Sequence, residues 1–478
     1  MRASQVANQR ALRALSSLTG LQGTDLEDGA RESTDSGGGS GTNHGLREVL
    51  STEPPVLGIP DAVQFHVLSF EGPDPYARIG GLETRVGGIC EALLAARHET
   101  HLWFVGDPDR PGHELRDGLA LHRWCQWLSR YHPAGVYDGQ NTKVADYAKS
   151  LPPFMVHEHL LPHLRAGGLA VVMAEEWQTV DAVLHLDHLL RRSGLRDRVR
   201  MLWNANNVFG FERIDWPRLS EAAAITTVSR YMKQMMKAAG AEAIAIPNGL
   251  SPDAYLPPDR AAVAQLRRQF AGRTALTKMA RWDPDKRWLA SVEIVSEMRK
   301  LGLKPLLIAR GGREAHGAVV IKAMRDAGLH IIERGYTTGE VRGLVQALSD
   351  IGNADVVQLT THVDPDGRRA LFRASDVVLA NSEHEPFGLV GLEAMAAGGI
   401  ACTGFSGEDY AVPGRNALVL QTSDPGEFVG LCRQLQADSA YEASLRRAGR
   451  ATARHFAWPE VIRNLLVPRL RLSALAAE

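Results

Sequence analysis

Short apolar runs recur along the chain from about residue 61, and each is followed by a loop or by a segment with helical periodicity. In the first such segment, Val86, Ile89, Leu93 and Leu94 return at helical spacing and form one apolar stripe. The runs that predict strands in this half cover 65–70, 100–106, 169–174, 199–203 and 224–228. This alternation is typical of a parallel sheet with helices on both faces.

A second series begins near residue 272. Its apolar runs predict strands at 274–280, 305–310, 330–335, 355–361, 376–381 and 400–404, and amphipathic segments predict helices at 288–300, 339–349 and 428–436. The two series meet at "PNGLSPDAYLPPD" (247–259), whose prolines and glycine suit a hinge. The sequence therefore predicts an α/β protein with two doubly wound halves, and ligands beyond the carboxyl ends of the strands.

Capping residues mark two helix boundaries in this pattern. Ser229 directly follows a predicted strand and is a suitable N-cap for the helix "RYMKQMMKAAG", which Gly240 ends. Gly388 lies between the strand at 376–381 and the apolar segment "LVGLEAMAA", so it predicts the start of another helix. Helix N-termini carry unpaired N–H groups and a partial positive charge, which suits a phosphate.

Composition and charge exclude several classes of protein. The 478 residues are too many for one hydrophobic core, and the formal net charge of -1 gives no general attraction to nucleic acid or anionic membranes. The four cysteines are far apart, without metal-type spacing, and no run of about 18 apolar residues occurs. We expect reduced, mostly buried thiols, no transmembrane segment and a cytoplasmic location. Residues 22–60 are rich in Gly, Ser, Thr and acidic residues and predict a flexible tail, preceded at most by a short helix.

The stretch "EHEPFGLVGLEAMAAGG" (383–399) places two carboxylates around a predicted helix start. Glu393 lies five residues beyond Gly388, where a carboxylate can accept two hydrogen bonds from a ribose diol. Glu385 precedes the helix and can meet sugar hydroxyls. The alternative is an ordinary capped helix with one acid on its solvent face.

Two further motifs follow predicted strands. In "KMARWDPDKRW", Arg281 and Lys286 flank a turn, and two fixed cations there can neutralise a departing diphosphate. In "ARIGGLETRVGG", Gly80 and Gly81 let backbone N–H groups approach an anion or a sugar. The alternatives are solvated surface charges and an ordinary turn. Neither a dinucleotide G-x-G-x-x-G spacing nor a P-loop is present.

The order of these motifs resembles that of the GT-B retaining glycosyltransferases, especially the family-four group and the related bacterial glycogen and starch synthases. The resemblance covers roughly residues 63 to 465. "EPFGLVGLEAMAAG" is similar to the Glu–seven–Glu motif of that family, and "RIGGL" resembles the lysine-any-Gly-Gly-Leu loop, with Arg78 in the lysine's place. "EEW" resembles an aspartate–tryptophan pair, with Glu176 in the aspartate's place. The segments 228–250 and 456–461 look like the domain-closing segment and the start of the C-terminal helix that crosses back onto the first domain.

The resemblance implies a fold, a domain division and a set of roles. The fold would be GT-B, with two Rossmann-like domains facing a central cleft. The implied parts are a tail (1–60), an acceptor domain (61–255), a donor domain (256–454) and the crossing helix (455–478). Arg281 and Lys286 would bind the donor diphosphate, Glu393 the ribose and Glu385 the donor sugar. Backbone N–H groups of Gly388, Leu389 and Val390 would meet phosphate and sugar, and Gly80 and Gly81 would approach from the opposite domain. No metal and no cofactor would be needed.

The sequence departs from the family pattern in one place. Many relatives have a histidine at the strand end that corresponds to "MLWNANNVFG". Counting back from Gly210 without gaps favours Asn204 as its replacement, and Asn206 is the alternative. An amide can bond a sugar hydroxyl but cannot carry charge. The histidines of "VHEHL" (156–160) are interpreted as part of a surface loop.

The predicted function is that of a metal-independent retaining hexosyltransferase. It would move a hexosyl group, glucosyl on the strength of "RIGGL", from a nucleoside diphosphate sugar to a hydroxyl of a carbohydrate or small-molecule acceptor. One alternative is a protein that binds a nucleotide sugar without turnover, and another is a nucleotide-sugar 2-epimerase. The donor base, the sugar, the acceptor and the oligomeric state stay open.

Overall fold

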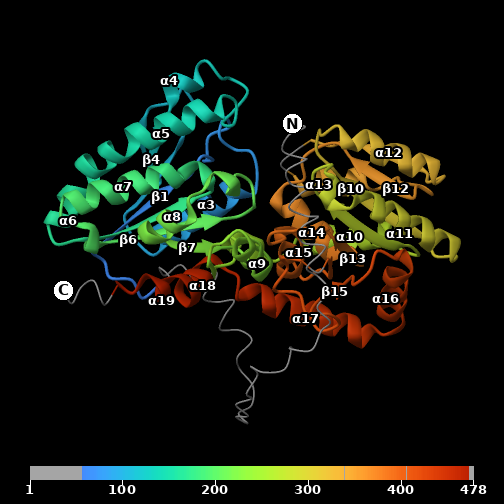
Figure 1. Ribbon diagram of the computed structural model, residues 1–478. Helices are drawn as coiled ribbons and strands as arrows, with labels where there is room; N and C mark the ends of the chain where they lie inside the picture. The colour runs from blue at the N-terminus through green and yellow to red at the C-terminus, as the bar shows by residue number, and fades with distance from the viewer. Residues whose placement is uncertain (1–55, 338–339, 405, 473–478) are drawn as a thin grey trace, which may run out of the picture. The chain divides into compact units, whose positions relative to one another are not determined.

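The computed structural model describes residues 56–337, 340–404 and 406–472, which form two α/β sheets (Figure 1). The short helix and the predicted tail up to residue 55 lie outside the described residues, whereas residues 56–60 of that tail are described, and Leu57 and Ile59 are buried there. The first sheet has the order β3-β4-β2-β1-β5-β6-β7-β8. Its strands are β1 (Val63–Leu68), β2 (Thr100–Val105), β3 (His113–Arg116), β4 (Leu119–Trp124), β5 (Leu169–Glu175), β6 (Val199–Ala205), β7 (Ala224–Thr227) and β8 (Ile244–Ala245).

The second sheet has the order β11-β12-β10-β9-β13-β14-β15. Its strands are β9 (Thr274–Met279), β10 (Pro305–Arg310), β11 (Ile331–Arg334), β12 (Val356–Leu359), β13 (Val377–Ala380), β14 (Ala401–Thr403) and β15 (Leu418–Val419). Every strand pair is parallel except β3 with β4. Together with the similarity to solved structures reported below, the two sheets confirm the predicted two-domain, Rossmann-like fold.

Helices connect the strands and cover the faces of the sheets. In the first half they are α3 (Gly81–Ala95), α4 (Gln126–Ser129), α5 (Gln140–Met155), the π-helix η1 (Val156–Leu160), α6 (Leu161–Arg165), α7 (Val180–Arg192), α8 (Trp216–Ala222) and α9 (Arg230–Ala238), with single turns η2 (Trp177–Thr179), η3 (Arg196–Arg198), η4 (Phe211–Arg213) and η5 (Pro252–Tyr255).

In the second half they are α10 (Arg260–Gln269), η6 (Pro284–Lys286), α11 (Trp288–Lys300), α12 (His316–Asp326), α13 (Val341–Ala347), α14 (Pro365–Ala374), α15 (Leu389–Ala396), α16 (Pro425–Ala437), α17 (Ser439–Arg454), α18 (Trp458–Val461), η7 (Ile462–Leu466) and α19 (Val467–Leu470). Within the described ranges, no helix combines the length and the apolar composition that crossing a membrane requires.

The strand order reverses once in each sheet, and the reversal determines where ligands can bind. In the first sheet the chain moves outward from β1 through β2, and then returns to the other side of β1 as β5. The second sheet repeats this reversal between β9 and β13. Loops that leave such a pair of strands diverge to opposite faces and open a crevice at their carboxyl ends. The predicted site motifs follow β1, β5, β9 and β13.

The predicted strands are all present, whereas β3, β4 and the two-residue strands β8 and β15 were not predicted. The sequences of β3 and β4, HELR and LALHRW, contain charged residues and histidines and have no continuous apolar run. β3 is an edge strand on which exposed residues alternate with half-buried ones. An edge strand needs no apolar run because it is not covered on both faces.

Both predicted helix starts are confirmed, and one predicted loop is wrong. Ser229 Oγ accepts a hydrogen bond of 3.1 Å from the Met232 N–H at the start of α9. Gly388 is the N-cap of α15, with a positive φ of 79° that disfavours other residues. The segment 156–160 is not a surface loop but the π-helix η1, which continues α5 beyond two prolines in its last turn.

The C-terminal segment packs against the first sheet and its helix α3. Trp458 of α18 lies so close to Gly88 and Gly249 that a Cβ at either position would come within 2.6 Å of its ring. Arg200 Nε of β6 donates a hydrogen bond of 3.0 Å to the Leu470 carbonyl. Figure 1 shows α18 and α19, in red, next to the green strands of this sheet. These contacts join the chain after residue 455 to the first half.

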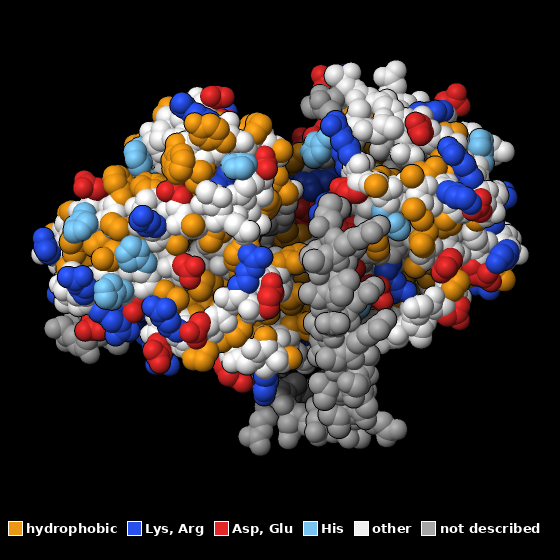
Figure 2. All heavy atoms as spheres, turned by 45° about the horizontal axis from the view of Figure 1, so that its top comes forward, with side chains coloured by type: hydrophobic (Ala, Val, Ile, Leu, Met, Phe, Trp, Pro, Cys, Tyr) orange, Lys and Arg blue, Asp and Glu red, His pale blue; other side chains and the backbone are white. Residues whose placement is uncertain are grey.

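The four cysteines are unpaired and buried, as predicted. Acidic, basic and apolar side chains are interspersed over the face in Figure 2, in keeping with the formal net charge of -1. That face therefore carries no extended patch of one charge.

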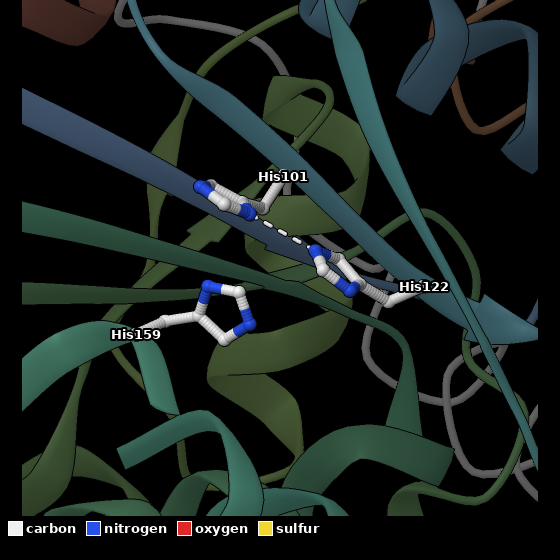
Figure 3. A group of neighbouring side chains, drawn as sticks. All are labelled: His101, His122 and His159. Atoms are coloured by element: carbon white, nitrogen blue, oxygen red, sulfur yellow. Dashed lines mark hydrogen bonds between the residues drawn. The ribbon is translucent and has the colours of Figure 1, made fainter. Parts of the chain in front are cut away.

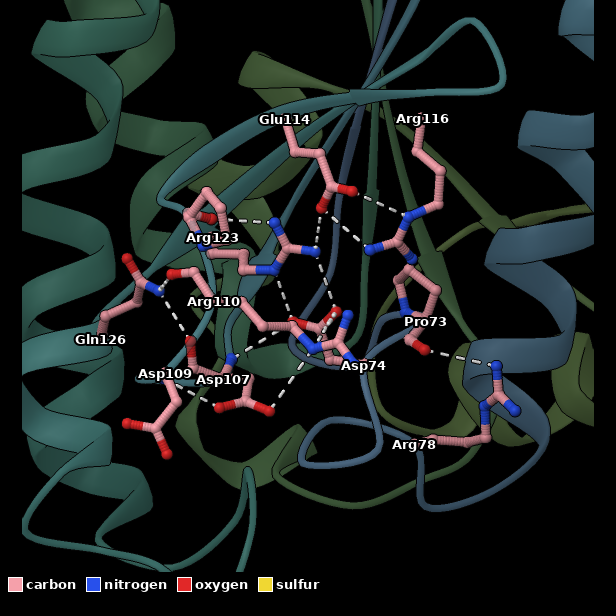
Figure 4. A network of polar contacts seen from close by, with 11 residues as sticks. Pro73, Asp74, Arg78, Asp107, Asp109, Arg110, Glu114, Arg116, Arg123 and Gln126 are labelled. Atoms are coloured by element: carbon pink, nitrogen blue, oxygen red, sulfur yellow. Dashed lines mark hydrogen bonds and ion pairs between the residues drawn. The ribbon is translucent and has the colours of Figure 1, made fainter.

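A buried ion pair holds the loop that follows β1. The Arg123 guanidinium in β4 donates hydrogen bonds of 2.6 and 3.0 Å to Asp74, and both side chains are fully buried (Figure 4). Arg123 also donates to Glu114 at 2.7 Å and to the Pro111 carbonyl at 2.8 Å. These bonds satisfy the guanidinium and fix the loop that leads to α3.

We expect the substitution Asp74→Ala to lower the free energy of unfolding by about 3–5 kcal/mol, because it leaves the buried Arg123 charge without its main partner. Urea denaturation followed by circular dichroism measures this change. The exposed neighbour Asp109 is the control, and Asp109→Ala should change stability by less than about 0.5 kcal/mol. Equal effects of the two substitutions would contradict the importance of the buried pair.

Candidate functional site

The loops after β9 and β13 meet at the reversal point of the second sheet. Lys286 Nζ of η6 lies 2.5 Å from Glu385 Oε2, and both side chains are about one-fifth exposed. The backbone supports this contact, because the Glu383 N–H donates a hydrogen bond of 2.9 Å to the Asp285 carbonyl. The structure thus brings together two residues that are 99 positions apart. Their direct contact was not predicted from the sequence.

Arg281 begins the turn that carries Lys286, and its guanidinium is largely exposed. Its side chain is 65% exposed and lies 3.8 Å from Asp283. The backbone of the turn is fixed by a hydrogen bond of 2.8 Å, which Trp288 Nε1 donates to the Arg281 carbonyl. Trp282 packs on Trp288 with ring centroids 4.2 Å apart. The backbone of the turn is therefore fixed, and the guanidinium is accessible to a ligand.

The N-terminus of α15 faces the same loops. No side chain caps its first turn, and Gly388, Leu389 and Val390 are all partly exposed. A Cβ at Gly388 would come within 2.7 Å of Glu408 and 3.2 Å of Glu385. The glycine is required both by its φ and by these two neighbours. The arrangement leaves backbone N–H groups available to an anion.

Glu393 lies further along α15 and forms an ion pair with Arg368 of α14 at 3.1 Å. Its side chain is 22% exposed. Burial raises the pKa of Glu393, and Arg368 opposes that shift. The residue is on the predicted helix at the predicted position. Its role toward a ribose stays a prediction.

Glu408 is a candidate that the sequence analysis missed. It is 5% exposed, and neither carboxylate oxygen has a hydrogen-bond partner among the described residues. Burial, with Glu385 as the second cause, raises the pKa of Glu408 to about 8. Its place on a glycine-flanked loop after β14 was a usable sequence signal. At neutral pH this carboxyl is largely protonated and can donate a hydrogen bond.

Lys278 and Asn381 form a second missed pair at the same reversal point. Lys278 Nζ of β9 donates a hydrogen bond of 2.6 Å to Asn381 Oδ1, and both residues are buried. The pKa of Lys278 is lowered to about 7, first by burial and next by the charge of Lys286. A lysine inside an otherwise apolar strand was the signal that could have identified it. This residue adds a titratable cation beside Lys286.

The glycines after β1 lie at the start of α3, as predicted. Gly80 is its N-cap, and the space next to the Cα atoms of both Gly80 and Gly81 is open. The Gly80 N–H is engaged, because it donates a hydrogen bond of 3.1 Å to the buried carboxylate of Glu71. Arg78 is exposed and lies 3.4 Å from Glu83. Glu71, a further residue that was not predicted, therefore organises this helix start.

Glu176 follows β5 in a strained backbone conformation. Its φ of 69° and ψ of 163° lie in a region that is almost restricted to glycine and costs of order 1–3 kcal/mol. The side chain is buried and accepts a hydrogen bond of 2.7 Å from the Asn206 N–H. Burial raises the pKa of Glu176 to about 8. Strain and a raised pKa together mark this position as a functional candidate.

The two asparagines at the end of β6 are bound to one buried carboxylate. Asn204 and Asn206 donate hydrogen bonds of 2.8 and 2.9 Å to Glu175 Oε2, and Arg85 forms an ion pair with the same carboxylate at 3.0 Å. Asn204 is buried and also accepts a hydrogen bond of 3.0 Å from Thr226. Asn206 is half-buried. The structure therefore engages both amides within the protein, and Asn206 is the one with solvent access.

Comparison with known families accounts for both halves of the chain. Residues 79–254 match the family described as Glycosyltransferase Family 4, and residues 309–452 match the one described as Glycosyl transferases group 1. Taken together, the two matches support a glycosyltransferase of the family-four type. The predicted resemblance is thereby confirmed, and the candidate loops of this glycosyltransferase lie mostly within the matched ranges.

Solved structures show the same fold. Sucrose-phosphate synthase from Thermosynechococcus elongatus is 18% identical, with a TM-score of 0.61 over 87% of this chain and 100% of that one. A trehalose-phosphate synthase from Burkholderia xenovorans is 14% identical, with a TM-score of 0.58 over 85% and 100% of the two chains. At these identities the similarity shows the GT-B fold and does not define the substrate.

Curated relatives match over shorter segments. The D-inositol 3-phosphate glycosyltransferase of Streptomyces avermitilis is 36% identical over 121 residues, which are 24% of this chain and 25% of that protein. The enzyme of the same name from Salinispora tropica is 30% identical over 125 residues, 26% of each chain. This glycosyltransferase thus spans about a quarter of the length of these relatives in the matched region.

We expect Glu408→Gln to change how stability depends on pH. The pKa of Glu408 is raised in the folded state, so between about pH 4.5 and pH 8 the folded protein retains a proton that the unfolded chain releases. Wild-type stability therefore falls through this range, and the substitution removes that loss. The melting temperature of the variant relative to wild type should rise by about 1–3 °C between pH 5 and pH 8. A constant difference between the two proteins would contradict the raised pKa.

Proposed function

We propose that this protein is a retaining glycosyltransferase, which moves a hexosyl group, most simply glucosyl, from a nucleoside diphosphate sugar to an acceptor hydroxyl. The observation that carries the proposal is the convergence of Lys286, Glu385 and the uncapped start of α15 at the reversal point of the second sheet. A cation, a carboxylate and free N–H groups in one place suit a ligand that contains both phosphate and sugar hydroxyls.

The donor would lie along α15 in this proposal. Its diphosphate accepts hydrogen bonds from the first turn of the helix, while Arg281 and Lys286 neutralise its charge. Glu393 accepts hydrogen bonds from the ribose, and Glu385 and the protonated Glu408 contact hydroxyls of the sugar. Lys286 then interacts with phosphate as well as with Glu385.

The transfer step breaks the bond between the anomeric carbon and the diphosphate oxygen. The acceptor oxygen forms the new bond on the face that the diphosphate leaves, and its proton passes to a departing phosphate oxygen. Negative charge grows on the diphosphate during this step, so Arg281, Lys286 and the N–H groups of α15 bind the transition state more tightly than the ground state. These groups supply the electrostatic stabilisation without a metal ion, which stays a prediction.

The loops of the first sheet would complete the site. Gly80 and Gly81 offer an unobstructed backbone, and Glu176 and Asn206 supply polar groups near the end of β5 and β6. Rotation about the segment 247–259 would bring these loops toward the donor and exclude water, which favours transfer over hydrolysis.

Names of related proteins suggest which acceptors to test. The curated relatives are named for inositol phosphate, and the Burkholderia enzyme was solved with glucose-6-phosphate. A phosphorylated polyol or hexose is therefore the first class of acceptor to examine. The binding experiment described below would identify the base and the sugar of the donor.

One second candidate function has its own observation. The resemblance implies that Asn204, or alternatively Asn206, replaces a histidine of the family, and both amides are bound to Glu175. A protein that binds a nucleotide sugar without turning it over would show donor binding but neither transfer nor hydrolysis. A 2-epimerase would instead release an epimerised donor in the absence of any acceptor.

We expect Lys286→Ala to fold normally and to lose at least about a hundredfold in turnover, because it removes a cation that stabilises the departing diphosphate. Steady-state kinetics of nucleoside diphosphate release measure the loss. Lys300→Ala is the matched control, since Lys300 is an exposed lysine that forms a surface ion pair with Glu297 at 3.3 Å. Wild-type turnover in Lys286→Ala would remove this residue from the proposed mechanism.

We also expect one class of nucleoside diphosphate sugar to raise the melting temperature without added metal. Ligand at about 100 times its dissociation constant adds about 2.7 kcal/mol of stability, which a thermal shift assay detects. Glu393→Ala should reduce or abolish the shift, whereas Glu333→Ala, at an exposed site in β11, should retain it. If no donor shifts the wild-type protein with or without magnesium, the proposed function is wrong.

A further inference from the structure

Five histidines converge on one face of the first sheet, outside the candidate transfer site. His66, His101, His122 and His113 lie on β1, β2, β4 and β3, which are consecutive strands. In the strand register His66 is opposite His101, and His122 is opposite His113. The π-helix η1 brings His159 over the same face, where its ring contacts those of His101 and His122. The proposed transfer does not use these residues.

Three of these side chains point their ring nitrogens at one another. His101 Nδ1 lies 2.9 Å from His122 Nε2, and one ring nitrogen from each of His101, His122 and His159 lies within 4.8 Å of the other two (Figure 3). A tetrahedral zinc ion with bonds of about 2.0–2.1 Å separates its ligand nitrogens by about 3.3–3.4 Å. The separations in the structure, 2.9 Å for one pair and at most 4.8 Å for the others, span this spacing.

Neighbouring groups orient two of the rings for coordination. His101 Nε2 lies 3.0 Å from Glu99 Oε1, and that carboxylate also accepts a hydrogen bond of 2.7 Å from Gln64. A carboxylate on one ring nitrogen holds the proton there and leaves the other nitrogen, Nδ1, free to bind a metal. His122 Nδ1 lies 2.8 Å from His113 Nδ1. The His113 nitrogen can accept a hydrogen bond from the His122 Nδ1–H, which leaves His122 Nε2 free to bind a metal. Such outer partners are typical of histidine metal sites.

The rings of His101 and His122 are buried, and that of His159 is half-buried. Aromatic packing accounts for part of the burial, because Trp103 stacks on His122 with ring centroids 3.8 Å apart. Stacking alone gives no reason for nitrogens from three separate elements to face one point.

We propose that His101, His122 and His159 form a binding site for a divalent transition-metal ion. The ion would be zinc, with the three imidazoles as ligands and a water molecule in the fourth position. A set of three imidazoles suits zinc better than magnesium or calcium, which prefer oxygen. His159 is only half-buried, so the ion has a route from solvent. The metal ties the neighbouring strands β2 and β4 to the helical layer through η1.

The site is separate from the transfer reaction. His101 is the second residue of β2, whereas the candidate transfer residues follow the carboxyl ends of their strands. The metal therefore stabilises the first half of the chain and takes no part in the proposed chemistry. This inference does not depend on the proposed function.

The test uses the untagged full chain, treated with a chelator, dialysed and titrated with zinc chloride. We expect one zinc ion per chain, a dissociation constant below about 1 μM and a higher melting temperature. Cobalt chloride, added in place of zinc, should give the visible absorption of a four-coordinate site. Calorimetry measures the affinity, and elemental analysis measures the stoichiometry.

His159→Ala is the principal variant, because its partly exposed side chain can be removed without opening the core. It should bind zinc at least about a hundredfold more weakly and lose the cobalt spectrum. His157→Ala is the matched control, since His157 is an exposed residue of the same π-helix and should leave both signals unchanged. His101→Gln provides a second ligand variant, with circular dichroism as the check on folding.

Two results would overturn the proposal. One is a folded wild-type protein that binds no stoichiometric zinc or cobalt. The other is a His159→Ala variant that retains wild-type zinc affinity, because the ion would then be bound elsewhere. Loss of binding in His157→Ala to the same extent would equally contradict the assigned ligands.

Discussion

Parallel strands impose the constraint on which the candidate transfer site depends. Because every strand of the second sheet runs in the same direction, the loops after β9, β13 and β14 must emerge at one edge. The reversal of strand order next to β9 separates the outgoing helices and leaves the loops uncovered there. Lys286, Glu385 and Glu408 come from three different loops and meet for this reason. The strand order of the sheet, and not a local sequence motif, brings these residues into contact.

Buried polar groups serve different purposes in the two sheets. In the first, Glu175 is fully engaged by Arg85, Asn204 and Asn206, and the guanidinium of Arg85 also bonds Asn248 at 2.8 Å. Such a satisfied network rigidifies the ends of the strands. In the second, Glu408 is buried without a described hydrogen-bond partner. A buried carboxyl group without a hydrogen bond lowers the stability of the fold. A ligand that forms a hydrogen bond with it removes that cost.

The sequence predicted the elements that bury continuous apolar runs and the helix starts that depend on one residue, such as Ser229 and Gly388. It failed where order comes from distant contacts. Strand β4 is held by pairing with β2, and β3 by pairing with β4 and by the bond from Arg123 to Glu114, so neither strand depends on an apolar run of its own. The segment 156–160 follows Pro152 and Pro153, which lie inside α5, and only the structure shows that the helix continues.

The residues of the candidate site were also predictable only where the signal in the sequence is local. Residues that directly follow strands, such as Arg281, Lys286, Glu385 and Gly388, were identified because strand ends are visible in the sequence. Glu71, Glu408 and Lys278 were missed, since their significance depends on burial and on partners many residues away. The histidine cluster is the extreme case, because its members lie on four strands and a helix.

The backbone at Glu176 has a consequence for the evolution and engineering of this chain. A glycine would adopt the same φ and ψ without the strain of about 1–3 kcal/mol that glutamate accepts there. Selection for thermostability alone would therefore favour the loss of this carboxylate. A library screened only for heat resistance would enrich variants that have lost one of the polar groups of the first half. Screens on this protein need a second readout at position 176, because heat resistance alone does not retain the carboxylate.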